Sequence, residues 1–110
     1  MTNPNKAKGS QWERDVVAYL QANGFPYAER RFGAGAKLDK GDIVGIPGVT
    51  IEAKNHAKFA LSDWLAQAEE ERKNAGNKFG VVIVKRRGKP TKDGYVVMSL
   101  ETFVEIVEED

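Results

Sequence analysis

The sequence contains no cysteine and a single histidine, His56, among its 110 residues. Disulfides, thiolate metal sites and a cysteine nucleophile are therefore excluded, and one histidine cannot form a multi-histidine zinc site within one chain. No apolar run approaches the roughly 20 residues that a membrane-spanning helix needs. No charged-then-apolar leader is visible at the N-terminus, so we expect a cytoplasmic protein.

The two signs of charge are unevenly distributed along the chain. All 17 lysines and arginines lie within residues 1–92, which carry only 10 acidic residues, whereas residues 93–110 carry six acidic residues and no basic ones. A segregated basic body indicates a polyanionic partner, and a solvated surface with an acidic last helix explains the same pattern.

Capping and stop signals predict where the first helix lies. Ser10 and Glu13 have the spacing of a capping box, and Asn23-Gly24 is a C-terminal stop signal, so a helix is expected between them. We expect residues 1–9 to form a flexible basic arm and residues 10–110 to form a single domain.

Two more helices and five strands complete the expected fold. Ser62 is a candidate N-cap for a helix that ends at Gly76, and Ser99 is expected to cap a last helix with an apolar face. That face comprises Leu100, Phe103, Val104 and Val107. Strands are expected at 25–32, 43–46, 49–54, 79–85 and 95–98. The order αβββαββα predicts an α+β fold in which helices flank a mixed sheet.

The most informative segment is the predicted hairpin at residues 41–54. Side chains alternate along a strand, so Glu52 and Lys54 share one face while Ala53 points to the other. Asp42 opens the preceding strand, and strand pairing would bring its carboxylate near Glu52. Two converging carboxylates form a hard-oxygen site that suits Mg²⁺ or Mn²⁺, with the Ala53 carbonyl as a further ligand.

Such a site supports phosphodiester hydrolysis. A divalent cation offsets negative charge on the phosphate and acidifies its water, while Lys54 can orient or deprotonate that water. Each residue also has a simpler explanation, because Asp42 fits a turn and Glu52 with Lys54 fits a surface ion pair worth about 0–1 kcal/mol. The occurrence of all three together favours catalysis.

The ordered motifs resemble those of the PD-(D/E)xK nuclease superfamily. Asp42 and the Glu52-Ala53-Lys54 segment match the pattern D-x9-E-x-K. The Lys8-Gly9 segment that leads into a helix carrying Glu13 is similar to the archaeal and phage Holliday-junction resolvases, and the likeness spans roughly residues 6–87. It implies a restriction-endonuclease-like fold and Mg²⁺-dependent cleavage of four-way DNA junctions in recombination or repair.

The resemblance also implies roles for individual residues. Glu13 joins Asp42, Glu52 and Lys54 in the catalytic set and shares the metal with the two strand carboxylates and the Ala53 carbonyl, although Glu13 could instead complete the capping box. Gln67 matches a helix residue that lines the site in the superfamily and is equally suited to a helix surface. His56 fits a surface position better than a phosphate contact. Residues 69–71, all glutamate, are expected to form a solvated face.

Basic residues in the loops beside the site are candidates for contacts with DNA phosphates. They are Arg30, Arg31, Lys37, Lys40, Lys85, Arg86, Arg87 and Lys89. No segment is typical of a helix that reads the major groove, so recognition of DNA shape is expected. A four-way junction has approximate two-fold symmetry, which favours a homodimer, with the helix at 62–75 and the strand from Phe79 as candidate interfaces. The alternatives are another PD-(D/E)xK DNA endonuclease and a non-catalytic DNA-binding module.

Overall fold

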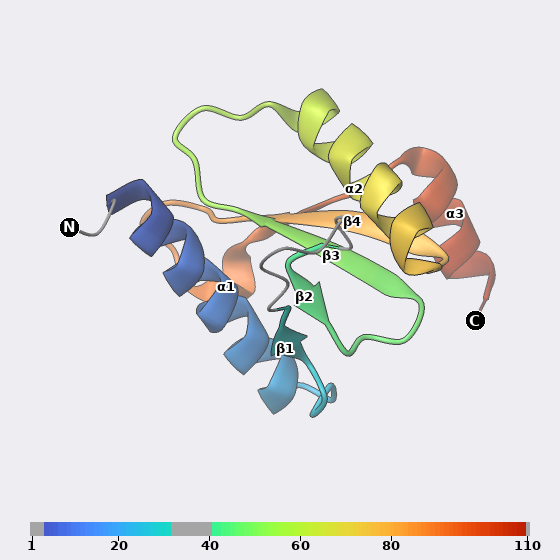
Figure 1. Ribbon diagram of the computed structural model, residues 1–110, viewed down its shortest axis with the longest axis horizontal. Helices are drawn as coiled ribbons and strands as arrows, with labels where there is room; N and C mark the ends of the chain where they lie inside the picture. Colours follow the sequence, from blue (N-terminus) through green and yellow to red (C-terminus); the bar gives the residue numbers. More distant parts are fainter. Residues whose placement is uncertain (1–3, 32–40, 110) are drawn as a thin grey trace.

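The computed structural model describes residues 4–31 and 41–109, which form an α+β fold (Figure 1). The predicted order αβββαββα is confirmed. The elements are α1 (Pro4–Ala22), β1 (Glu29–Arg30), β2 (Ile43–Val44), β3 (Val49–Lys54), α2 (Leu61–Ala75), β4 (Phe79–Val84), the 3₁₀ helix η1 (Thr91–Asp93), β5 (Tyr95–Val97) and α3 (Leu100–Glu108).

The five strands form one mixed sheet in the order β1-β2-β3-β4-β5. β3 and β4 are parallel, in a register that pairs Val49 with Phe79 and Lys54 with Val84, and the other neighbouring strands are antiparallel. The parallel pair requires a crossover, which α2 provides. None of the helices in the described ranges is long and apolar enough to cross a membrane.

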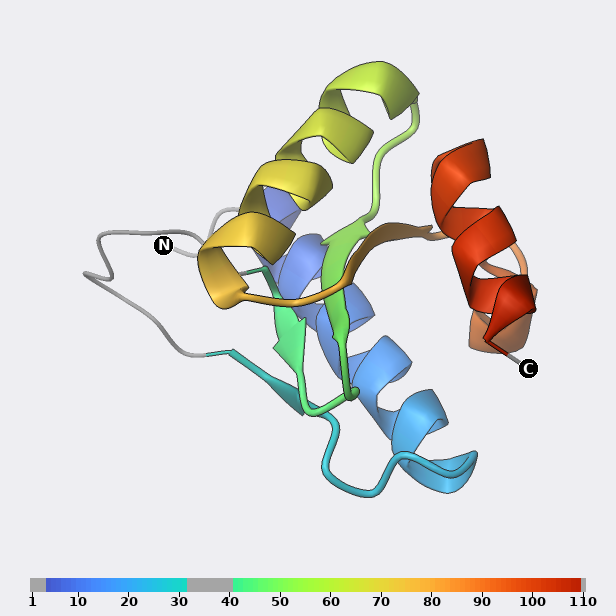
Figure 2. The same ribbon diagram turned by 90° about the vertical axis from the view of Figure 1, so that its right-hand side faces the viewer.

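Helices α1 and α2 cover the two faces of the sheet (Figure 2). The α1 face is packed by Trp12, Val16, Ile43, Ile51 and Val81, and the α2 face by Trp64, Ala68, Val82 and Val84. The alternation along β3 therefore puts Ile51 on the α1 face and Glu52 on the α2 face, as the sequence predicts. A charged residue is thus carried into the interior of the fold.

Two predicted helix starts are wrong. Helix α1 begins at Pro4, so residues 4–9 are helical where an arm was expected, and Ser10 lies inside the helix instead of capping it. Proline fits the first turn of a helix because its missing N–H would have no intrahelical partner there. Helix α2 begins at Leu61 after Ala60, with no side-chain cap, so Ser62 is not its N-cap.

Other boundary signals are confirmed. Gly76 ends α2 in the left-handed conformation, and the Ser99 hydroxyl accepts a hydrogen bond from the Thr102 N–H at 3.0 Å at the start of α3. The strand expected at 25–32 is much shorter in the described residues, where β1 comprises only Glu29–Arg30. Proline and turn residues before it restrict ladder pairing.

The apolar face of α3 is exposed, which the sequence pattern did not anticipate. Leu100 is 77% exposed and Phe103 53% exposed, and Val104 and Val107 are also exposed. The buried residue of this helix is Thr102. The helical periodicity was correct, but it does not reveal whether the stripe faces the core of its own chain.

Candidate active site

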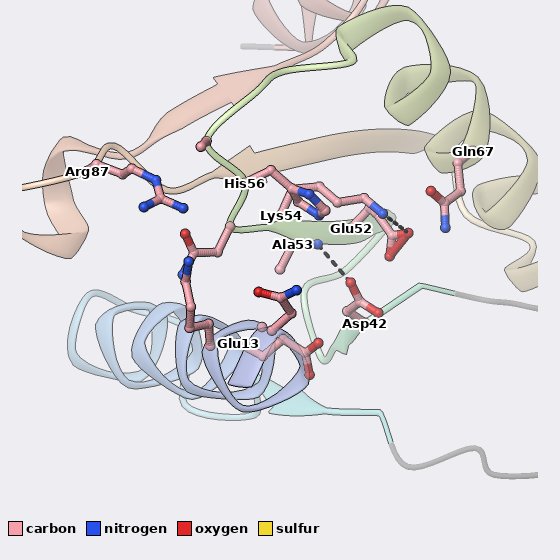
Figure 3. A pocket seen from close by; sticks show the side chains of 13 residues that line it. Glu13, Asp42, Glu52, Ala53, Lys54, His56, Gln67 and Arg87 are labelled. Atoms are coloured by element: carbon pink, nitrogen blue, oxygen red, sulfur yellow. Dashed lines mark hydrogen bonds and ion pairs between the residues drawn. The ribbon is translucent and has the colours of Figure 1, made fainter. Parts of the chain in front are cut away.

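A hollow of about 490 Å³ lies where β3 ends, and its walls come from α1, β3, α2 and the loop after β4 (Figure 3). All five residues that the sequence predicts to be catalytic line it, together with Ala53: they are Glu13, Asp42, Glu52, Lys54 and Gln67. His56 and Arg87 line it as well. Residues from five separate segments of the chain therefore meet at one place.

Asp42 is held in this hollow through its backbone and its side chain. Its N–H donates to the Ile51 carbonyl and its own carbonyl accepts from the Arg31 N–H, each at 2.8 Å. The Ala53 N–H donates to the Asp42 carboxylate at 2.9 Å (Figure 3). Gly41 stands directly before Asp42, where the PD-(D/E)xK pattern has proline. Its φ is +94°, which proline cannot adopt because its ring fixes φ near −65°.

Glu52 is a buried carboxylate among other acids. Glu52 is 2% exposed, and the Lys54 ammonium lies 3.8 Å from one oxygen of the Glu52 carboxylate. Burial raises the pKa of the Glu52 carboxyl well above the ordinary 4.5, and the neighbouring Asp42 and then Glu71 raise it further. The folded protein therefore holds the Glu52 proton more tightly than an exposed glutamate would.

Glu13 approaches from α1 and is held by an arginine. The Arg30 guanidinium donates to the Glu13 carboxylate at 3.0 Å, and both side chains are about one-fifth exposed. Burial and the charge of Asp42 raise the pKa of Glu13, whereas Arg30 and Arg14 lower it. Glu13 does not complete a capping box, because Ser10 lies within the helix.

Glu71 is a buried neighbour of the site that the sequence pattern did not reveal. Residues 69–71 were expected to be solvated, but Glu71 is 1% exposed and acts on the pKa of Glu52. The missed signal is helical spacing, since Trp64, Ala68 and Glu71 follow each other at intervals of four and three and form the buried face of α2. Glu71 therefore belongs to the carboxyl cluster behind the hollow.

The residues predicted to contact DNA are scattered in the structure. Arg87 lines the hollow, and Arg30 is engaged with Glu13. Arg31 lines a separate hollow beside the β2–β3 turn, and the Arg86 guanidinium lies 5.5 Å from the centroid of the Tyr95 ring. Lys37 and Lys40 lie outside the described residues.

Two further residues line the hollow without a resolved role. Gln67 reaches it from α2, on the side opposite Arg87 (Figure 3). The His56 ring lies 5.2 Å from the Trp64 ring, measured between centroids, so part of its surface packs on an aromatic side chain.

Within residues 4–31 and 41–109, no set of three or more His, Asp or Glu side chains is arranged to hold a metal ion by itself. Asp42 and Glu52 nevertheless supply hard oxygen atoms in one place. Such pairs typically bind Mg²⁺ with help from carbonyl groups, water and substrate phosphates. The geometry therefore fits a metal that is completed by its substrate better than a metal enclosed by protein.

Comparison with known proteins yields one match. The model of the protein family described as "Phage putative PDDEXK endonuclease" matches residues 4–110. No curated protein and no solved structure matches the chain.

Proposed function

This chain belongs to the phage PDDEXK endonuclease family, and from that premise we propose that it is a divalent-metal-dependent endonuclease selective for four-way DNA junctions. The observation that carries the proposal is the convergence of Asp42, Glu52 and Lys54 in one hollow. These are the acidic and basic groups of the D-x9-E-x-K pattern, and they reach the hollow from two neighbouring strand segments.

A divalent cation fits the donor groups of this hollow. Asp42 and Glu52 would hold it, with the Ala53 carbonyl as a further oxygen donor, and Glu13 would position a water molecule beside it. The raised pKa of Glu52 supports this assignment, because clustered carboxyls away from water repel each other until a cation is present. When bound, Mg²⁺ or Mn²⁺ would offset negative charge on the scissile phosphate and make water more acidic.

The protein's own groups orient the reactants. The Lys54 ammonium has three N–H donors and can bind the attacking water or a phosphate oxygen, where it stabilises the charge that develops during attack. Arg30 keeps the Glu13 carboxylate directed at the hollow. Gln67 can donate or accept a hydrogen bond at the opposite wall.

Selectivity for junctions is supported by the Lys8-Gly9 segment and its helix. Both residues line the hollow together with Glu13, so the features that resemble junction resolvases belong to the site itself. Phosphate contacts through basic loops position DNA without reading its sequence. Recombination or repair of phage DNA is the pathway that this activity would serve.

The first test is cleavage of a synthetic four-way junction with Mg²⁺. We expect Asp42→Asn and Lys54→Ala each to lower the rate at least about 100-fold, as removal of one transition-state stabilising group commonly does. The matched control is Asp63→Asn, an exposed acid in the first turn of α2, which should cut like wild type. Wild-type rates in both site variants would overturn the proposal.

Metal binding needs a readout that does not depend on cleavage. Mg²⁺ should raise the melting temperature of the wild type, because a ligand that binds only the folded state stabilises it. Mg²⁺ should not raise the melting temperature of Asp42→Asn. An equal shift in both proteins would place the metal elsewhere.

A competition experiment separates the finer alternatives. Junction and linear duplex are mixed at moderate salt, and the proposal expects preferential cutting of the junction. Equal rates would leave a general PD-(D/E)xK DNA endonuclease. Metal-independent, salt-sensitive binding without cleavage would instead indicate a non-catalytic DNA-binding module.

A further inference from the structure

We propose that a second hollow, adjoining the active-site hollow, binds a DNA backbone phosphate that flanks the scissile one. This inference rests on the proposed function, because that function makes DNA the ligand. The second hollow has a volume of about 360 Å³ and shares Lys8, Asn55 and Arg87 with the first. A strand that occupies the first hollow can therefore continue into the second along a common wall.

The two hollows carry different charges. Glu13, Asp42 and Glu52 line the first beside Lys8, Lys54 and Arg87, so its acidic residues are as numerous as its lysines and arginines. The second is lined by Lys8, Lys85 and Arg87, with Asp15 as its acidic residue. A phosphate can bind this second hollow directly, because its three cations outnumber its one acidic residue.

Lys85 is held in place before any ligand arrives. Its backbone N–H donates to the Lys54 carbonyl at 2.9 Å, and its ammonium lies 5.4 Å from the centroid of the Trp12 ring. Trp12 is itself buried, and its indole N–H donates to the Ile83 carbonyl at 3.1 Å. The cation–π contact therefore orders the ammonium at a fixed ring, which lowers the entropic cost of binding an anion.

The charges in the second hollow are also available to a ligand. In the described part of the chain, the ion pairs involve Arg30, Lys54, Arg72 and Lys78, and none involves Lys8, Lys85 or Arg87. The acid of this hollow is engaged, since Asp15 accepts a hydrogen bond from the Gln11 amide at 2.8 Å. The three cations and one carboxylate leave this hollow with a net positive charge.

The test is a double-mutant cycle between protein and DNA. Four-way junctions are made in which one phosphate at a time, on either side of the cut, is replaced by a neutral methylphosphonate. We expect Lys8→Ala and Lys85→Ala each to lower kcat/KM about 10-fold. At one flanking position, the neutral linkage should cost the wild type about 10-fold and each variant less than about 2-fold. Lys73→Ala, an exposed lysine near the end of α2, is the control and should retain the full wild-type penalty.

A binding measurement separates failure of this site from failure of the proposed function. The slope of log affinity against log salt should fall by about 0.9 in Lys8→Ala and Lys85→Ala but not in Lys73→Ala, as loss of one phosphate contact requires. If the wild type cuts no DNA, the proposed function fails, and the salt slopes alone decide whether the phosphate site stands. A third outcome is that the wild type cuts while the penalty of the neutral linkage multiplies with that of each lysine substitution at every flanking position. In that case the phosphate site is wrong and the proposed nuclease function stands.

Discussion

Glu52 is the buried carboxyl whose pKa is raised by burial and by its acidic neighbours Asp42 and Glu71. Because its pKa is raised above 4.5 in the folded protein, the folded state holds this proton more tightly than the unfolded chain does. Stability from this group is complete below pH 4.5 and is lost as the pH rises toward the folded pKa. Glu13, whose pKa is also raised, acts in the same direction.

We therefore expect the melting temperature of the metal-free protein to fall between pH 5 and pH 8. Glu52→Gln replaces the carboxyl with an amide that cannot ionise in the unfolded chain. It should therefore raise the melting temperature at pH 8 by at least about 4 °C, the shift produced by roughly 1 kcal/mol in a domain of this size. Thermal unfolding monitored by circular dichroism measures both effects. Glu70→Gln, an exposed neighbour on α2, should leave the wild-type pH profile unchanged. A Glu52→Gln profile as steep as the wild type would contradict this account.

Arg30 is a residue for which the structure offers a role that sequence analysis did not consider. Sequence analysis made it a DNA contact, but its guanidinium is bonded to Glu13. If it acts mainly by orienting Glu13, Arg30→Gln should slow cleavage roughly 10-fold, and adding it to Glu13→Gln should cost little more. Single-turnover rates of the two variants and the double variant measure this coupling. Arg87→Gln combined with Glu13→Gln is the comparison, and its effects should multiply. Multiplying effects for Arg30 as well would make it an independent contact.

Sequence predicted most of the site at the scale of residues because strand alternation and spacing determine which side chains share a face. Glu52 and Lys54 needed only the period of two along β3. Arg30 and Glu71 could not be assigned in this way. Their roles depend on which long-range neighbours the folded chain supplies, and single-residue patterns do not contain that information.

At the scale of elements, the start of the β2–β3 hairpin depends on Gly41. Its φ of +94° is unfavourable for other residues, and a Cβ there would lie 2.7 Å from the Thr50 methyl group and 3.1 Å from the Ile51 carbonyl oxygen. Gly48 at the other end of the hairpin also has a positive φ, +74°, but a Cβ there would contact nothing within 4 Å. A side chain at Gly48 would therefore meet backbone strain alone, whereas one at Gly41 would meet both backbone strain and a steric clash.

Gly48→Ala should cost about 1 kcal/mol of unfolding free energy, whereas Gly41→Ala should cost about 2–4 kcal/mol, since strain and overpacking add. Chemical denaturation measures both values. Gly41→Ala should also slow cleavage, because Asp42 would move with its backbone. Equal destabilisation by the two variants would show that the conflict at Gly41 relaxes easily.

The elements themselves were predicted with uneven success for a physical reason. β3 was predicted with its observed bounds, since the Pro47-Gly48 turn signal lies directly before its first residue. The N-termini of α1 and α2 were wrong because a serine with good capping spacing does not cap a helix that begins earlier. A capping residue allows a helix to begin at several positions, and the packing of the whole helix determines where it does begin.

At the scale of the whole molecule, α3 turns its apolar stripe to solvent while charges act on its other side. Glu109 pairs with Lys78, and the charges of Glu105 and Glu101 act on Arg72 after that of Glu69. The stripe comprises Leu100, Phe103, Val104 and Val107, all exposed. Figure 2 shows α3 standing apart from α1 and α2. An exposed apolar stripe of this kind is typical of an interaction surface.

We propose that a second copy of the chain covers this stripe. Residues spaced three and four apart run along one side of the helix, so the stripes of two copies can pack against each other across a two-fold axis. This surface is a further candidate beside α2 and the Phe79 strand, of which Trp64 and Phe79 themselves are buried within their own chain. The symmetry would also supply two active sites for the two strands of a junction.

Sedimentation of the wild type at about 50 µM should therefore show a dimer, and Phe103→Glu with Val107→Glu should convert it to a monomer, because charges buried in an apolar interface without partners are costly. Tyr27→Glu, which replaces an aromatic residue that is 83% exposed elsewhere, should leave the dimer intact. The monomeric variant should keep its folded circular dichroism spectrum and lose paired cutting of the junction, with single nicks remaining. A wild type that stays monomeric at this concentration would leave the stripe to a different partner and would remove the symmetry argument for paired cleavage.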